Sequence, residues 1–338
     1  MNRFLQSLVV LCLVLVAALV ILSAYIRLDH AGLGCADWPA CYGRIGTLET
    51  HPAGHSTADT VSAYQQLANE KQAPKDWAMT AHRTIASLLG LSIIALTFTA
   101  VARRRKRAPV LIPLLLLGLT VFLAVLGNWS GGLHRPAVVL GNLIGGFGML
   151  ILLWLLHLRQ RRYSGGGYAT PHTLRAWIRF GVLLLCAQIL LGSLTSANFA
   201  ALACTSFPDC YGNWLPGPAI AKAFDILRVL PVNAAGVVSS GAETQAIHMA
   251  HRLGAWLTFL TLGWIALQAI RAGGIYRDSG FALLVLLLAE ISIGVAAVLS
   301  SLPIALATTH NALAALLLLN LITLHHKTRT ASLGNAWQ

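Results

Sequence analysis

The sequence predicts an all-α integral membrane protein with eight transmembrane helices, arranged as two parallel-repeat four-helix bundles. Three observations predict this fold. Of the 338 residues, 57% are hydrophobic and only 10% are charged. Apolar runs of about 18 residues or more, long enough to cross a bilayer, fill most of the chain. The same motifs also recur at a constant offset of 169 residues, which indicates an internal duplication.

The first apolar run, from Phe4 to Tyr25, has the leading charge and apolar block of a secretory signal peptide. It is long for such a signal and continues into Arg27 without a clear cleavage site, so we expect a retained helix. Further apolar runs follow along the chain. The eight predicted spans are residues 4–26, 77–101, 109–130, 137–158, 174–196, 244–270, 279–300 and 304–324.

The formal net charge of +13 raises the question of nucleic-acid binding, but the placement of the charges favours a membrane protein. Basic residues cluster between the apolar runs, at Arg103–Arg107, Arg159–Arg162, Arg271–Arg277 and Lys327–Arg329. The eight spans place these clusters and both termini on one side, which is then cytoplasmic. The sequence therefore predicts a multi-pass protein of a bacterial-type inner membrane, in contact with lipid and not with nucleic acid.

Two long polar loops, about 27–76 and 197–243, are predicted on the opposite, outer side. Each loop opens with a cysteine pair of the same spacing that is followed by Tyr-Gly, and His82-Arg83 recurs as His251-Arg252. Each repeat has an even number of spans, so the repeats have the same orientation in the membrane. We expect an N-terminal repeat over residues 1–163, a cytoplasmic linker over 164–173 and a C-terminal repeat over 174–338.

The cysteine pairs predict disulfides in both outer loops. Four of the six cysteines form these pairs, Cys35 with Cys41 and Cys204 with Cys210. Disulfides persist outside the reducing cytoplasm, so each pair is expected to close a short loop. Two interpretations stay open for each: a redox-active bridge that is easily reduced, and a bridge that only fixes the loop.

Two histidines of the second half predict a heme site. His251 and His310 lie a few residues inside the outer ends of their spans. Ionisable side chains are costly in a bilayer, which makes both functional candidates. Histidines that face each other from two helices provide the axial ligands of a six-coordinate heme iron. The alternative is that each ring only binds a backbone carbonyl at its helix end.

Neighbouring side chains are candidate contacts of the cofactor. His248 lies one helical turn before His251, and it is predicted either at the rim of the cofactor or at the water interface. Arg252 and Arg83 each follow a histidine directly. An arginine near the membrane surface suits a carboxylate such as a heme propionate. The alternative is that each arginine contacts no cofactor and only extends its charged end from the membrane to the water interface.

The first half repeats this pattern less completely. His82 corresponds to His251, but Asn142 stands in the region that corresponds to His310. Asparagine is a poor iron ligand, and His134, in the short outer turn before this span, is the other candidate. Elsewhere, Glu290 is an acid well inside a late span, and we expect it to bond a polar group on a neighbouring helix, such as Gln188.

Three long segments resemble the signatures of the heme A synthase family, of the CtaA type. Residues 23–43, which contain the first cysteine pair, resemble its first-loop signature. Residues 247–255 and 302–318, which contain His251 and His310, resemble its two C-terminal motifs. The resemblance covers nearly the whole chain.

The resemblance implies an oxidoreductase that converts heme O to heme A by oxidising the C8 methyl group to a formyl group, for terminal oxidase biogenesis. It implies heme b between His251 and His310, and heme O as substrate with His82 as a ligand. It implies that Cys35 and Cys41 relay electrons or order the site. It also implies heme O synthase and the oxidase assembly machinery as partners, and self-association is compatible with it.

The sequence departs from the family pattern in the first half. Met79 stands where the family has a catalytic glutamate, three residues before His82, and Asn142 stands where it has a second histidine. Methionine cannot act as a base. The catalytic residue is therefore unassigned, with His134 and Asp76 as candidates. The alternative function is a non-catalytic heme b protein that serves as an electron relay or an oxidase-assembly partner.

Overall fold

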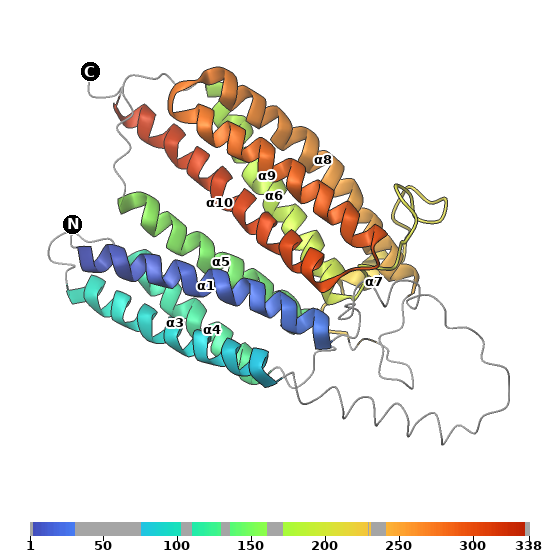
Figure 1. Ribbon diagram of the computed structural model, residues 1–338, viewed down its shortest axis with the longest axis horizontal. Helices are drawn as coiled ribbons and strands as arrows, with labels where there is room; N and C mark the ends of the chain where they lie inside the picture. The colour runs from blue at the N-terminus through green and yellow to red at the C-terminus, as the bar shows by residue number, and fades with distance from the viewer. Residues whose placement is uncertain are drawn as a thin grey trace.

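A computed structural model describes residues 3–30, 76–102, 110–129, 136–160, 172–228, 230 and 241–334. The regular elements in these ranges are helices (Figure 1). They are α1 (Arg3–His30), α3 (Asp76–Ala102), α4 (Leu111–Trp129), α5 (Pro136–Gln160), α6 (His172–Ala197), α7 (Ile220–Phe224), α8 (Ala242–Ala272), α9 (Gly274–Leu299) and α10 (Ile304–Gly334).

The long helices form two groups that lie side by side (Figure 1). One group contains α1, α3, α4 and α5, and the other contains α6, α8, α9 and α10. Contacts of α5 with α6 and α10, and of α1 with α10, join the groups. Trp154 donates a 2.9 Å hydrogen bond from Nε1 to Oγ1 of Thr323 across this seam. One apolar core cluster extends through both groups.

Seven of these helices are long and apolar enough to cross a membrane: α1, α3, α5, α6, α8, α9 and α10. The apolar part of α4, Leu111–Gly127, is shorter. At 1.5 Å per residue it rises roughly 26 Å, against about 30 Å for the hydrocarbon core of a bilayer. The prediction of a multi-pass, all-helical membrane protein is confirmed, and seven of the eight predicted spans meet the length and composition of a crossing helix.

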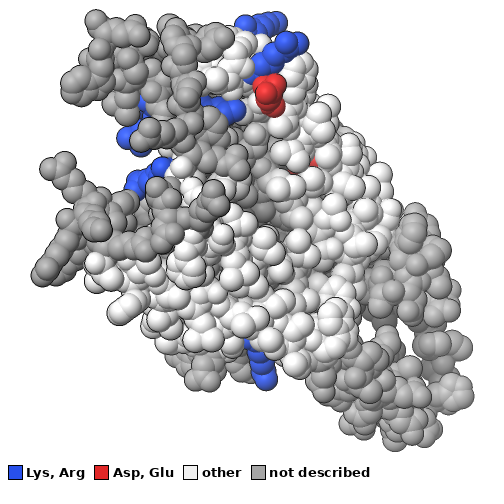
Figure 2. Space-filling view, turned by 60° about the vertical axis from the view of Figure 1, so that its left-hand side comes forward, with Lys and Arg blue, Asp and Glu red and all other residues white. Residues whose placement is uncertain are grey.

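The outward faces of the helices are apolar. Large side chains such as Leu91, Phe98, Leu183, Leu260 and Val285 are exposed on them. Figure 2 shows one face as a broad uncharged surface, with most of its Lys and Arg side chains gathered near one end. Such a surface requires lipid around it, because exposing so large an apolar area to water is unfavourable in free energy.

Basic residues gather where α5, α8 and α10 end and where α6 and α9 begin. They are Arg159, Arg175, Arg179, Arg271, Arg277, Lys327 and Arg329. At this end α8 and α9 are joined by Gly273 and Gly274, whose φ angles are 69° and 51°. Both angles lie in the left-handed region that favours glycine, so the pair makes a turn tight enough to bring α9 back against α8.

Candidate functional site

Two histidines face each other inside the second group of helices. The ring centroids of His251 on α8 and His310 on α10 lie 6.4 Å apart, and the ring planes are inclined at 83°. Both helices start at the same end of the bundle and run in the same direction (Figure 1). Each histidine lies in the first three turns of its helix, so the two rings meet at one depth.

Glycines on the two neighbouring helices leave room for the rings. A Cβ atom added at Gly192 of α6 would lie 3.0 Å from Cε1 of His251. A Cβ atom added at Gly294 of α9 would lie 2.9 Å from Cε1 of His310. Any larger residue at Gly294 would therefore require a shift of the His310 ring, which makes these glycines part of the site.

The same two helices supply a polar partner for each ring. Nε2 of Gln188 on α6 lies 3.0 Å from Nδ1 of His251, and it also donates to the His251 carbonyl oxygen at 3.0 Å. Oε2 of Glu290 on α9 lies 3.2 Å from Nδ1 of His310. The expected contact between Glu290 and Gln188 is not formed, because each side chain faces its own histidine.

A sequence signal for these partners exists, although sequence reasoning missed it. Gln188 precedes Gly192 by four residues, and Glu290 precedes Gly294 by four residues. Residues four apart lie on one face of a helix, so each pair presents a polar group and a gap to the same neighbour. A polar residue and a glycine at this spacing on an apolar span therefore indicate a helix that packs against a functional side chain.

The geometry of the pair fits a heme iron. Since Nδ1 of His310 faces the Glu290 carboxylate, Nε2 is the nitrogen of that ring left for a metal. In His251 the same use of Nε2 requires Nδ1 to carry the proton, with the Gln188 amide turned so that its oxygen accepts it. Imidazole nitrogens bind first-row metals at about 2.0 Å, which puts the centroids of two opposed imidazoles roughly 6 Å apart. The observed 6.4 Å agrees with this separation. No three His, Cys, Asp or Glu side chains converge within the described ranges, so the pair suits a metal that brings further ligands of its own.

For the heme site predicted from sequence, Gly294→Ala should weaken heme binding roughly tenfold, because displacing the predicted ligand His310 costs metal affinity. The matched control is Gly263→Ala on α8, where the nearest atom to an added Cβ is Leu287 Cδ2 at 3.9 Å. Both changes raise helix propensity by a similar amount, so propensity cancels between them. The measurement is a heme titration followed by absorbance. Equal affinities in the two variants would contradict the role given to Gly294.

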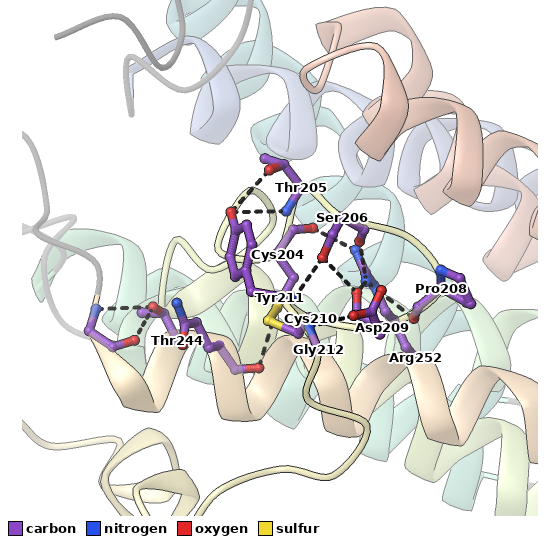
Figure 3. Close-up of a disulfide and its surroundings, with 12 residues drawn as sticks. Cys204, Thr205, Ser206, Pro208, Asp209, Cys210, Tyr211, Gly212, Thr244 and Arg252 are labelled. Atoms are coloured by element: carbon purple, nitrogen blue, oxygen red, sulfur yellow. Dashed lines mark hydrogen bonds between the residues drawn. A yellow bond between two sulfur atoms is a disulfide. The ribbon is translucent and has the colours of Figure 1, made fainter.

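Arg252 makes different contacts from those predicted (Figure 3). Its guanidinium donates to the carbonyl oxygens of Cys204, Ser206 and Asp209, and Cζ lies 5.7 Å from the ring centroid of Phe207. The side chain is 8% exposed. Arg252 therefore fixes the loop between α6 and α8, and its contact with a heme propionate stays a prediction.

The disulfide predicted between Cys204 and Cys210 is present, and both cysteines are buried. Cys210 and Asn213 exchange two backbone hydrogen bonds of 2.9 and 3.0 Å, which close a tight turn over Tyr211 and Gly212. Both turn residues have positive φ, 51° and 85°, as a type I′ turn requires. The Tyr-Gly pair after the cysteine is thus the turn that ends the loop, and the burial of the bridge favours its structural interpretation.

His248 and Arg83 differ in their surroundings. His248 is 3% exposed, so it does not lie at the water interface, and its Nδ1 has no hydrogen-bond partner among the described residues. A buried donor or acceptor without a partner is costly, which marks the ring as a functional candidate beside His251. Arg83 of α3 is exposed, unlike its counterpart Arg252.

Comparison with known proteins fixes the family. The chain matches the COX15-CtaA family, described as cytochrome oxidase assembly protein, over residues 6–322. This chain belongs to that family. It is 36% identical to the heme A synthase of Shewanella oneidensis over 93% of each chain. It is 29% identical to the heme A synthase of Mesorhizobium japonicum, over 90% of this chain and 85% of the relative.

The first half of this COX15-CtaA member keeps little of the polar site. At the offset of 169 residues, His251 corresponds to His82. The other polar residues of the site, Gln188, His248, Glu290 and His310, correspond to Leu19, Met79, Val121 and Gly141. His82 is half-buried on α3. The equivalent surroundings in the first half are therefore apolar apart from one imidazole.

The same offset assigns Gly141, and not Asn142, to the position of His310, since Asn142 corresponds to Asn311. A Cβ atom added at Gly141 would lie 2.6 Å from Cδ2 of Leu126 on α4. The space beside Gly141 is thus filled by a leucine side chain, and a histidine there would displace it.

Several predicted site residues of this family member lie outside the described residues. Cys35, Cys41 and His134 belong to segments that the structure does not describe, and the side chain of Asp76 is likewise outside it.

Proposed function

We propose that this chain is an oxidoreductase that converts heme O to heme A by oxidising a methyl group to a formyl group, for terminal oxidase biogenesis. The observation that carries the proposal is the opposed pair His251 and His310, in a chain that aligns over 93% of its length with a protein named heme A synthase. The alternative, a non-catalytic heme b protein, is not favoured, because the relatives carry the name of the enzyme.

His251 and His310 would hold heme b through their Nε2 atoms. Bound there, heme b supplies one-electron transfer. Glu290 would orient the His310 imidazole through Nδ1, and Gln188 holds the His251 ring from α6; such partners preserve the direction of a ligand.

The first half would hold heme O, with His82 as the ligand that the chain retains. Met79 has no acid–base chemistry, so proton transfer falls to another group, and His134 and Asp76 stay the candidates. Cys35 and Cys41 would order the outer side of this half or relay electrons from it.

The architecture we propose has eight spans in two parallel repeats, over residues 1–163 and 174–338, with a linker over 164–173. Its support is the order of the helices, in which α1, α3, α4 and α5 precede α6, α8, α9 and α10 at nearly the same offset. α4 would be the eighth span. The end that gathers basic residues would face the cytoplasm of a bacterial-type inner membrane, with both termini there. The cysteine loops would face the outer side, where disulfides persist.

The partners we propose follow from this chemistry. Heme O synthase would supply the substrate, and the terminal oxidase assembly machinery would take the product. Self-association is compatible with the apolar outer faces of the helices.

Heme extraction tests the proposal. Co-expression with heme O synthase, in a host without its own heme A synthase, should give heme A in the extract. His82→Ala should abolish heme A while the protein keeps its heme b, because His82 belongs to the other group of helices. Heme O alone, recovered beside folded protein that contains heme b, would refute the proposed conversion.

A further inference from the structure

We propose that Glu290 sets the reduction potential of the heme, because its carboxylate faces one axial ligand while the opposite ligand faces only a neutral amide. This inference rests on the proposed heme b site between His251 and His310. It assigns a positioning role to a residue that touches the iron only through His310.

The position of Glu290 is unusual for an acid. It lies in the interior of α9, far from both ends of a helix that is long and apolar enough to cross the membrane. Its side chain is 12% exposed. An ionisable acid inside a membrane-spanning helix is costly in free energy. Such a residue therefore marks a functional site by default.

The contact with His310 is the interaction available to this carboxylate. Oε2 of Glu290 lies 3.2 Å from Nδ1 of His310. Neither atom makes a well-aligned hydrogen bond to any residue in the described ranges. Gly294, one turn after Glu290, lets the His310 ring lie directly against α9. The carboxylate therefore lies within reach of Nδ1, and a small reorientation of the ring would let an Nδ1–H donate to it when Nε2 is bound to a metal.

Among the described residues, the side-chain partner of the ligand on the other side is uncharged. Nε2 of Gln188 lies 3.0 Å from Nδ1 of His251. A Cβ atom at Gly254 would collide with Oε1 of Gln188, so the absence of a side chain there lets the amide lie flat against α8. An amide adds no charge, and its oxygen would accept from Nδ1–H of His251 once the amide is turned over.

A carboxylate that accepts from Nδ1–H increases the electron donation of the ring through Nε2. It also places negative charge near the iron in a medium of low dielectric constant. Both effects stabilise ferric over ferrous heme and lower the reduction potential. The corresponding residues of the first half are Val121 and Leu19, so this control is confined to the second half.

The test is a potentiometric titration of the purified full-length protein with its heme b, followed by absorbance at fixed pH. Glu290→Gln keeps the shape and removes the charge, so the midpoint potential should shift to more positive values with unchanged heme content. Gln188→Glu adds a carboxylate to the other ligand and should shift the potential to more negative values. These opposite shifts distinguish electronic control from a structural role.

Asp278→Asn is the matched control on the same helix. Asp278 precedes Glu290 by twelve residues, which is roughly 18 Å along the helix, so its removal should leave the potential unchanged. An unchanged potential in Glu290→Gln at full heme content would overturn the inference and leave the proposed function intact. If Glu290→Gln loses its heme, the midpoint potential of Gln188→Glu is the deciding measurement. The absence of a negative shift in that variant would overturn the inference. A parent protein without heme b would overturn the proposed site itself.

Discussion

Replacing His310 by alanine should remove heme b from the protein. One of the two proposed axial ligands is lost, and the groups nearest the ring, Glu290 and Gly294, offer no imidazole nitrogen in its place. Since removal of a group that only holds a metal ligand in place costs about 10–100-fold in metal affinity, we expect a loss of at least about a hundredfold here. Heme b content per purified protein is measured as the pyridine hemochrome.

His326→Ala is the control for this experiment. His326 lies on the same helix, sixteen residues after His310, which is roughly 24 Å along α10. It should leave heme content unchanged. Heme A synthesis should be lost with His310→Ala and kept with the control. A full complement of low-spin heme b in His310→Ala would show that the two rings do not share an iron.

Replacing Arg252 by alanine should destabilise the protein by about 3–5 kcal/mol, because a buried charge with several hydrogen bonds is removed and its acceptors are left unpaired. Three carbonyl oxygens, those of Cys204, Ser206 and Asp209, lose their donor. The melting temperature in detergent, followed by tryptophan fluorescence, should fall by on the order of 5–10 °C.

Arg83→Ala is a control matched by the duplication itself. Arg83 follows His82 as Arg252 follows His251, but its side chain is exposed. Exposed substitutions of this kind change stability by about 0.5 kcal/mol or less. Similar melting temperatures for the two variants would contradict the view that Arg252 fixes the loop.

The two arginines also show where sequence reasoning reaches its limit. The His-Arg pair is identical in both halves, and sequence alone assigned both arginines to the same role. In the structure one is buried under a loop and the other is exposed. The path of the loop between α6 and α8 decides this difference, and no local pattern encodes that path.

Glu290 and Gln188 give the same lesson for helix interiors. Each is a polar residue in an apolar span, and sequence alone paired the two with each other. Their partners depend on how each helix is rotated about its axis. That rotation is set by close packing at Gly192, Gly254 and Gly294, which lies between residues far apart in the chain.

Hydropathy and motif spacing alone establish that this protein is helical and crosses a membrane, that its halves share an offset of 169 residues, and that His251 and His310 are the candidate ligands. Hydropathy, spacing and the cost of charge in lipid are local quantities, so one chain suffices to read them. Only the tertiary structure decided which side chains face the two rings and which arginine holds the disulfide loop. Those contacts join separate helices, and packing selects among arrangements that the sequence leaves equal.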